Sequence, residues 1–403
     1  MTELTELLPV LDDDMTKCVK CGMCHAHDAL YLASLDESLG TRGQLMLLNA
    51  AVREGAQVGD LFTEKMFCSL NSYDPQTNCP TGTPVLKILA QVRQHLLKTR
   101  GLQGLADMFG ERVLAAVSAS AAARQRAAVL AKVAAAELPA GNQWTDALRP
   151  LSDAGALAPA TALELLPEVS PAKGTGRVAY LVGSLTNYAA PEIAQATVKV
   201  LNAAGYEVVT PKAQKCPGDL FVTLGDLDTA AALAAHNAAV FAEFDTVVTS
   251  CAATGAAVKN GLAGDDSGLS AKVRDVTELL AEGFAPRARL DRKVAYHDDC
   301  QLRAGMKVTK EPKALLTAAA GSNFVELAAA DSASGAGEGP FSLFFAPLAQ
   351  KITAKKVERI VESKADVVAS GNVAAVLHLN EALERAGASA RMKHTVELLA
   401  EVC

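Results

Sequence analysis

Three cysteines set two residues apart near the start of the chain constrain its fold more than any other feature. They are Cys18, Cys21 and Cys24, in the segment CVKCGMC. The spacing C-x2-C-x2-C is typical of loops whose thiolates bind a [4Fe–4S] cluster, and the complete pattern adds a fourth cysteine followed by proline. Gly22 suits the tight turn that brings three such thiols together. The loop therefore predicts an iron–sulfur cluster whose fourth ligand lies elsewhere.

The fourth cysteine of this pattern would stand at position 28, where the sequence has Asp28. In proteins with two such runs, the fourth cysteine of each run binds the cluster of the other run. A second, altered run extends from Cys68 to Cys79, which directly precedes a proline. If each run supplies the fourth ligand to the cluster of the other run, one cluster has a complete set of four cysteines, which consists of Cys18, Cys21, Cys24 and Cys79. The other cluster has a depleted set, which consists of Asp28, Cys68, Asn71 and Asp74. We expect one [4Fe–4S] cluster, bound by the complete set.

Other readings of the complete set stay open. Four cysteine thiolates also bind structural zinc, and the four thiols can remain without a metal. His25 and His27 flank the first three cysteines. We expect them to form hydrogen bonds or to lie on the surface, because four thiols already fill the site.

The composition restricts the classes of function. The 403 residues carry a formal net charge of −7, whereas nucleic-acid binders present basic surfaces. The sequence contains no apolar run of membrane-spanning length, and its polar N-terminus does not resemble a signal peptide. Nine cysteines in such a chain are expected to be metal ligands or free thiols and not disulfides. We predict a cytoplasmic protein without a transmembrane segment, and leave open a peripheral association with the inner face of the membrane.

The first part of the chain, residues 1–175, has helical patterns. Residues 1–100 contain both cysteine runs, separated by the helix-like segment after GTRGQL and followed by another after NCPTGTP. Because helices and not strands separate the runs, we expect a helical ferredoxin-like domain. Residues 101–175 are rich in alanine and predict a helical connector, which Trp144 would anchor to the neighbouring domain.

An internal repeat organises the second half. The tripeptide Val-Ala-Tyr occurs at 178–180 and again at 294–296, each time at the start of a buried-looking strand. A further apolar strand recurs at 245–250 and 366–370, and helical segments lie between the strands. This alternation predicts two α/β units with parallel sheets, over residues 176–290 and 291–403.

The two units also share a spacing of thiol positions. The interval from Ser184 to Cys216 in the first unit equals the interval from Cys300 to Ser332 in the second. Each unit then has a further site after its later strand, at Cys251 and at Asn372. The equal spacing indicates a common pattern of C…CC-G…C-x2-C from which most cysteines have been lost.

Together with the N-terminal runs, this pattern resembles the iron–sulfur subunit of glycolate oxidase. More broadly, it resembles the family with cysteine-rich CCG domains, which includes heterodisulfide reductase catalytic subunits and lactate-utilisation proteins. The resemblance covers nearly the whole chain and is carried by CVKCGMC, GTRGQL, NCPTGTP, GRVAYLVGS, NAAGYEVVTPKAQKCPG, VTSCAATGAAVK, VAYHDDCQLRAG and ESKADVVASGNVAAVLHL. It implies a mixed α and α/β fold, with a helical ferredoxin domain followed by two CCG-type domains.

The departures from the family pattern restrict what the α/β units can bind. The family's thiol positions are occupied here by other residues, namely Ser184, Pro217, Thr254, Ser332, Ala333, Asn372 and Ala375. Two thiols in one unit and one in the other are too few for a multi-iron cluster. We expect Cys216, Cys251 and Cys300 to be buried remnants. The alternative is a zinc or small-ligand site that combines them with His297 or Asp298.

These observations favour an electron-transfer subunit without catalytic residues of its own. The chain has no glycine-rich dinucleotide fingerprint and no nucleophile–base pair, so substrate chemistry is expected on another subunit. The resemblance implies a flavoprotein dehydrogenase partner that carries FAD and oxidises a 2-hydroxy acid such as glycolate or lactate. It leaves room for a quinone-reducing or other electron-acceptor partner, and no nucleic-acid partner is expected. The rival readings are a structural docking subunit and a thiol redox protein that uses Cys300.

Overall fold

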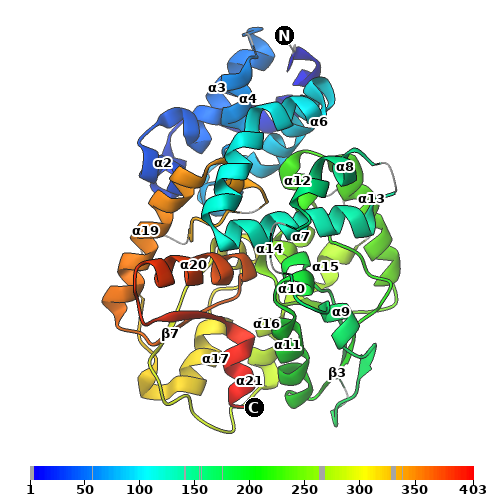
Figure 1. The fold of residues 1–403 in the computed structure, drawn as a ribbon, viewed down its shortest axis with the longest axis vertical. Helices are drawn as coiled ribbons and strands as arrows, with labels where there is room; N and C mark the ends of the chain where they lie inside the picture. The colour runs from blue at the N-terminus through cyan, green and yellow to red at the C-terminus, as the bar shows by residue number, and fades with distance from the viewer. Residues whose placement is uncertain are drawn as a thin grey trace.

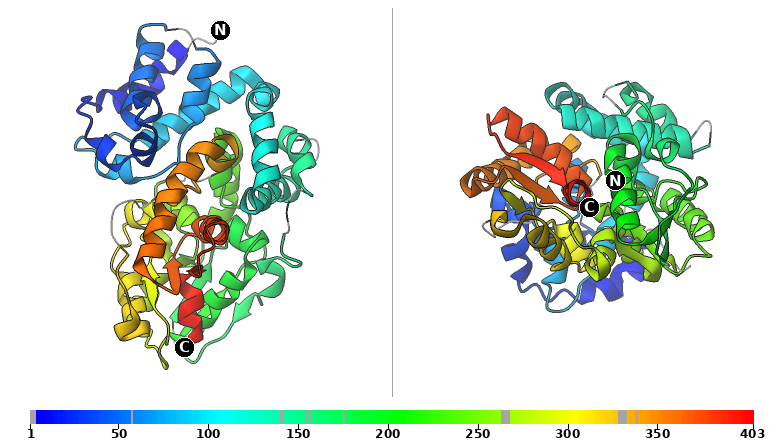
Figure 2. Two further views of the ribbon diagram at one scale, coloured as in Figure 1. Left: turned by 60° about the vertical axis from the view of Figure 1, so that its left-hand side comes forward. Right: turned by 90° about the horizontal axis from the view of Figure 1, so that it is seen from below.

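The chain folds into a helical lobe at its N-terminal end and a larger α/β lobe that carries the C-terminus (Figures 1 and 2). The computed structural model describes residues 4–56, 58–139, 142–153, 155, 157–174, 176–262, 268–327, 333–337 and 339–403. Within these residues, no helix combines the length and the apolar character needed to cross a membrane.

The described part of the helical lobe contains helices and 3₁₀ turns and no strand. Its elements are η1 (Leu4–Leu7), α1 (Leu8–Thr16), η2 (Met23–His27), α2 (Ala29–Ser34), η3 (Glu37–Leu39), α3 (Thr41–Arg53), α4 (Asp60–Phe67), α5 (Asp74–Thr77) and the first part of α6 (Val85–Ala119). The helix predicted after GTRGQL is α3, and its buried side recurs every three or four residues, as in Leu45, Leu48 and Val52. This side packs in one core with Leu11 and Ile88.

Helices from α6 to α9 join the two lobes. Helix α6 is interrupted at Gly101, whose φ of 71° and ψ of 165° only glycine adopts readily, so that its second half runs in a new direction. The remaining connector elements are α7 (Ala121–Glu137), α8 (Gln143–Leu148), η4 (Arg149–Leu151) and α9 (Ala162–Leu165). Trp144 of α8 is buried, donates to Asp226 Oδ2 at 2.6 Å and packs against Phe221. It therefore anchors the connector to the first α/β unit.

The first α/β unit is built on a five-stranded sheet in the order β1-β3-β2-β4-β5. Its elements are β1 (Val169–Ser170), β2 (Gly176–Tyr180), α10 (Ser184–Tyr188), α11 (Pro191–Ala203), β3 (Tyr206–Val209), α12 (Asp219–Leu224), α13 (Leu227–Val240), β4 (Val247–Thr249), α14 (Ala252–Lys259), α15 (Leu269–Lys272), β5 (Val273–Asp275) and α16 (Val276–Gly283). The four strands from β2 to β5 are parallel, as predicted. The edge strand β1 is antiparallel to β3, which the sequence repeat did not indicate because β1 precedes the repeat.

The second unit repeats this plan on a smaller scale, with the parallel sheet β6-β7-β8. Its elements are β6 (Val294–Tyr296), the π-helical turn η5 (Gln301–Met306), α17 (Glu311–Ala320), η6 (Gly321–Asn323), α18 (Phe341–Phe344), α19 (Ala346–Ser363), β7 (Val367–Ser370), α20 (Val373–Arg385), β8 (Arg391–His394) and α21 (Thr395–Glu401). Among the described residues, the counterpart of β3 is reduced to a single bridge between Val294 and Phe324.

The two α/β units meet near the carboxyl ends of their strands, which is where open parallel sheets usually place their sites. The amide of Ala252, after β4, donates to the carbonyl of Gly371, after β7, at 3.1 Å. Helix α14 also packs closely on η5, because a Cβ at Gly255 would collide with the side chain of Met306. The helical lobe contacts this junction, where Tyr73 donates to the carbonyl of Ala256 at 3.1 Å.

Candidate metal centre

The four thiols of the complete set line one cavity of about 30 Å³ in the helical lobe. Cys18 follows α1, Cys21 precedes η2, Cys24 lies within η2, and Cys79 follows α5. The folding of the lobe therefore brings Cys79 to a loop that is distant from it in the sequence. Gly22 makes the turn possible with a φ of 81°, and a Cβ there would lie 3.1 Å from Nη1 of Arg42 in α3.

Cys79 forms hydrogen bonds with the two threonines that follow it. The sulfur lies 3.4 Å from Thr81 Oγ1, and the thiol donates to Thr83 Oγ1 at 3.6 Å. A deprotonated sulfur would instead accept from both hydroxyls. Partial burial acts to raise the pKa of Cys79, but the hydroxyl and backbone donors of the two threonines outweigh burial and lower the pKa to about 7. The segment Cys-Pro-Thr-Gly-Thr thus favours a thiolate at this position.

The remaining thiols differ in their surroundings. Burial and the nearby carboxylate of Asp28 raise the pKa of Cys24 to about 11, and the backbone N–H of Arg42 opposes this shift. Cys21 is exposed, whereas the other three thiols of the complete set are half-buried. The charged residues that line the cavity are Lys20 and Arg42. Positive groups of this kind would stabilise an anionic thiolate-bound centre.

The two histidines beside the first three cysteines do not line the cavity. His25 stacks on Tyr31, with ring centroids 4.0 Å apart, and His27 is exposed. His27 therefore lies on the surface, one of the two positions expected for these histidines.

Asp28, the first member of the depleted set, is a buried hydrogen-bond acceptor. Its Oδ1 accepts from the amides of Leu30 and Tyr31 at 3.0 and 3.3 Å and so caps α2. Its Oδ2 accepts from the amide and the hydroxyl of Thr41 at 2.6 and 2.7 Å. Asp28 therefore joins the N-terminal ends of α2 and α3, and its carboxylate is fully used by the protein.

Asn71, the second substituted position, is bound by a buried arginine. Arg93 donates to Asn71 Oδ1 at 2.9 Å, to the carbonyl of Met66 at 2.8 Å and to the carbonyl of Thr223 at 3.4 Å. Arg93 is 2% exposed, and burial lowers its pKa to about 10, so it remains charged at neutral pH. The carbonyl of Asn71 also accepts from Gln301 Nε2 at 2.9 Å. This segment thus connects the helical lobe to both α/β units.

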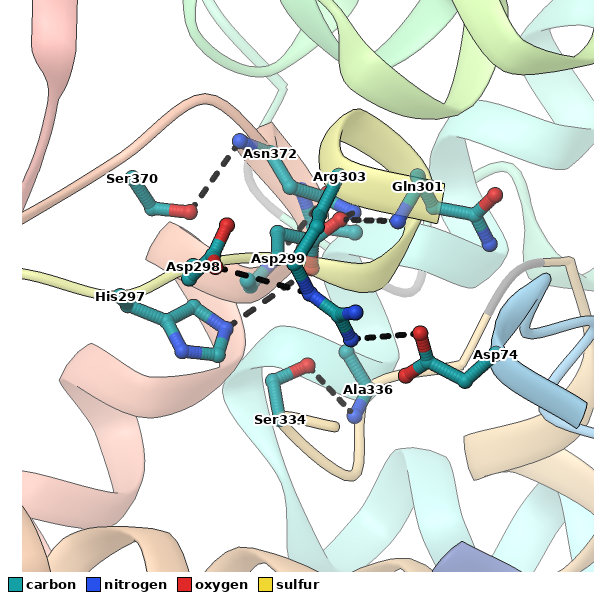
Figure 3. Close-up of polar contacts among 12 residues, drawn as sticks. Asp74, His297, Asp298, Asp299, Gln301, Arg303, Ser334, Ala336, Ser370 and Asn372 are labelled. Atoms are coloured by element: carbon teal, nitrogen blue, oxygen red, sulfur yellow. Dashed lines mark hydrogen bonds and ion pairs between the residues drawn. The ribbon is translucent and has the colours of Figure 1, made fainter. Parts of the chain in front are cut away.

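Asp74, the third substituted position, forms an ion pair with the second α/β unit (Figure 3). Arg303 Nη2 lies 2.5 Å from Asp74 Oδ1, and Arg303 Nε lies 3.5 Å from Asp298 Oδ2. Cys68, the remaining thiol of the depleted set, is fully buried, and burial raises its pKa to about 12. It is therefore a poor source of thiolate at neutral pH.

Three members of the depleted set line three different spaces. Asp28 lines a cavity of about 20 Å³, Cys68 lines a groove of about 1310 Å³, and Asn71 lines a third cavity of about 30 Å³. Sequence reasoning identified these positions but missed Arg93 and Arg303, which bind Asn71 and Asp74 respectively. Neither arginine stands at a motif spacing, so the sequence held no signal for these contacts.

In the first α/β unit, the positions aligned by thiol spacing come together. Ser184 Oγ donates to Cys216 Sγ at 3.1 Å. A Cβ at Gly183 would lie 2.7 Å from Cys251 Cβ and 2.9 Å from Thr254 Oγ1, so Cys251 and Thr254 pack against Gly183, which directly precedes Ser184. Both thiols are buried, as expected for remnants of a lost site, and burial raises the pKa of Cys216.

In the second unit, the later thiol position has a structural role. Asn372 occupies it and caps α20 by accepting from the amides of Ala374 and Ala375 at 2.9 and 3.3 Å. Its side-chain amide also donates to Asp299 Oδ1 at 3.0 Å. The substitution has therefore turned a thiol position into a helix cap. The earlier positions of the pattern are Cys300 and Ala333, which are buried, and Ser332, which lies outside the described residues.

His297 and Asp299 form a buried polar pair after β6, beside the half-buried Asp298 (Figure 3). His297 Nε2 lies 3.8 Å from Asp299 Oδ2, and burial lowers the pKa of His297 well below its ordinary value. Burial raises the pKa of Asp299 to about 6, against the hydrogen bonds from Asn372 and Gln301. Within the described residues, no three His, Cys, Asp or Glu side chains are arranged to hold a single metal ion. A four-iron cluster is a different case, because each of its cysteines binds a different iron atom.

Comparison with known proteins places these features in a family context. The model of a cysteine-rich domain, CCG, matches residues 178–258 and again residues 294–379. An uncharacterized iron–sulfur protein of Methanococcus maripaludis is 34% identical over 52% of this chain, and the match spans 42% of that protein, less than half of its length. The probable glycolate oxidase iron–sulfur subunit of Bacillus subtilis is 25% identical over 97% of this chain and 94% of its own.

A third relative covers a shorter part of the chain. Lactate utilization protein A of Geobacillus kaustophilus is 28% identical over 55% of this chain and 98% of its own length. The segments matched by the CCG model agree with the internal repeat, since each begins at a Val-Ala-Tyr strand. The chain thus contains two copies of the cysteine-rich CCG domain and is homologous to the glycolate oxidase iron–sulfur subunit, lactate utilization protein A and other iron–sulfur proteins.

Proposed function

We propose that the protein is an electron-transfer subunit that carries one [4Fe–4S] cluster on Cys18, Cys21, Cys24 and Cys79, with the helical lobe as its ferredoxin-like domain. The observation that carries this proposal is the contrast between the two ligand sets. The complete set lines a single cavity, whereas members of the depleted set line three different cavities. The substituted positions of the depleted set are occupied by hydrogen bonds and an ion pair within the protein.

The donor chemistry of the complete set fits this cluster. Four cysteine thiolates are the usual ligands of a [4Fe–4S] centre, which when bound supplies one-electron transfer. Thr81 and Thr83 place hydroxyls beside Cys79, and Lys20 and Arg42 bring positive charge to the cavity. Hydrogen bonds to the sulfurs and nearby charge are the means by which a protein sets the potential of such a centre.

The most direct test compares two cysteine variants of the full-length protein. Cys79→Ser removes a proposed ligand, so we expect the iron content of anaerobically purified protein to fall sharply. Cys68→Ser removes a buried thiol that is not a proposed ligand, so the iron content should remain that of the unsubstituted protein. Equal iron contents in the two variants would contradict the ligand assignment.

We further infer that this subunit works with a flavoprotein. Two relatives are named for glycolate oxidase and for lactate utilization, which supports oxidation of a 2-hydroxy acid at FAD on a partner subunit. The α/β units retain only Cys216, Cys251 and Cys300 of their thiol pattern, which supports placing the substrate chemistry outside this chain. A quinone-reducing or other acceptor protein would then take the electrons.

Purification from native extract tests this second part. A stable complex should contain FAD, and addition of glycolate or lactate should bleach the flavin and then the visible absorbance of the cluster. A protein that is recovered only as a monomer or homodimer, with no flavin, would favour the alternative that this chain is a structural subunit.

A further inference from the structure

Two exposed hydrophobic residues flank the exposed thiol of the complete set in the sequence. Val19 is 63% exposed and Met23 is 57% exposed, and each lies two positions from Cys21. Of the twelve large hydrophobic side chains that are exposed among the described residues, eight lie before position 68. The exposed apolar surface is therefore concentrated on the lobe that holds the candidate cluster site.

The charge beside this thiol has the opposite sign to that of the whole chain. The protein carries a formal net charge of −7, yet the charged residues that line the cavity are Lys20 and Arg42. Arg42 pairs with Glu37 at 3.2 Å, so its charge is partly balanced within the protein. Lys20 is exposed and adjoins Cys21 directly, so its ammonium group is available to a partner.

Two lysines that adjoin the segments around the cavity, Lys17 after α1 and Lys87 on α6, share one carboxylate. Asp14 at the end of α1 is shared by Lys17 and Lys87, whose ammonium groups lie 2.7 and 2.8 Å from its two carboxylate oxygens. Two lysines on one carboxylate leave one positive charge in excess at this contact. Both lysines remain partly exposed, but the neighbouring Asp13 is an exposed carboxylate that offsets this excess, so Lys20 is the main positive charge beside the thiol.

We propose that Val19, Lys20, Cys21 and Met23 form a docking rim for a redox partner protein that is acidic around its own exposed cofactor. This inference rests on the proposed function, because the rim matters only if the complete set binds a cluster. Positive charge on the rim steers an acidic partner, and the apolar side chains exclude water from the contact. One electron leaves the cofactor of the donor and one enters the cluster, with no bond made or broken.

The test uses flavodoxin hydroquinone, a small acidic flavoprotein, as the donor to the full-length, cluster-loaded protein. Lys20→Glu should lower the second-order rate constant for cluster reduction by a factor on the order of 10 at low ionic strength. The difference should shrink as salt is added, because the Debye length falls to about 3 Å at 1 M.

The matched charge control lies in the α/β lobe. Lys173→Glu reverses an exposed charge between β1 and β2 and should leave the rate unchanged. The adjacent Gly174 packs against Gly205, which directly precedes β3. Strand β3 lies at the end of the α/β lobe that points away from the helical lobe (Figure 1), so the control is remote from the rim.

The apolar part of the rim is tested by binding and not by electron transfer. Met23→Ser should weaken the binding of oxidised flavodoxin, measured by titration calorimetry, by a factor of roughly 3 to 10. Val361→Ser, at a position 51% exposed on α19, is the matched control and should bind normally. Cluster loading is checked in every variant by its EPR spectrum after dithionite reduction.

Two outcomes count against the inference in distinguishable ways. If the loaded Lys20→Glu and Met23→Ser variants behave like their controls, the rim is not the docking surface, and the proposed function is unaffected. If the unsubstituted protein binds no cluster, the proposed function fails and this inference fails with it.

Discussion

Replacing Asp28 tests whether a former ligand position has become structural. The Asp28→Ala variant would leave four donors without their acceptor, namely the amides of Leu30, Tyr31 and Thr41 and the Thr41 hydroxyl. Loss of a helix cap costs about 1 kcal/mol, and each additional buried donor without a partner costs about 1–3 kcal/mol. The hydroxyl can turn to another acceptor, so we expect the free energy of unfolding to fall by about 3 kcal/mol.

Urea unfolding of the cluster-loaded protein, followed by the visible absorbance of the cluster, measures this loss. Asp36→Ala is the matched control, because Asp36 also caps a helical turn but is exposed. It accepts from the Ser38 amide at 2.9 Å and pairs with Lys65 at 3.2 Å, so its removal should cost about 1 kcal/mol. An Asp28→Ala variant no less stable than Asp36→Ala would refute the reasoning.

Three further predictions concern the cluster, the pH dependence and the contact between the lobes. Thr83→Val should lower the midpoint potential of the cluster in an EPR-monitored titration, while Thr83→Ser keeps it; an unchanged potential in the valine variant would count against a tuning role. Burial raises the pKa of the Asp275 carboxyl from 3.8 to about 7. As the pH rises, the unfolded chain therefore releases this proton at a lower pH than the folded protein does. The free energy of unfolding should then fall by about 1.4 kcal/mol per pH unit between about pH 4 and 7. Asp275→Asn should flatten that slope in urea titrations, and an equal slope would contradict the assignment. Arg303→Met should speed hydrogen exchange of the segment around Asp74, because the ion pair that holds it is lost; unchanged protection would show that the pair is dispensable.

Much of the secondary structure was predictable because it depends on local patterns. The repeated Val-Ala-Tyr strands are β2 and β6, and the later apolar strands are β4 and β7. The helix predicted after GTRGQL begins earlier, at Thr41 within that segment, and the single tryptophan anchors the connector as expected. The predicted domain boundaries near positions 100, 175 and 290 remain predictions.

The contacts of the depleted set could not be predicted, because they join segments that are distant in sequence. Arg93 reaches Asn71 from α6, and Arg303 reaches Asp74 from the second α/β unit. No spacing rule links Arg93 to Asn71 within the helical lobe, or Arg303 of the second α/β unit to Asp74 of the helical lobe. The donors to Cys79 were closer to being predictable, since Thr81 and Thr83 follow it almost directly in the sequence.

Quantitative iron and sulfide analysis with an EPR spectrum tests the central claim most directly. The full-length protein, purified without oxygen, should contain about four iron and about four sulfide per chain, and dithionite should produce the signal of one reduced [4Fe–4S] cluster. About eight iron per chain, or zinc in place of iron, would contradict the account.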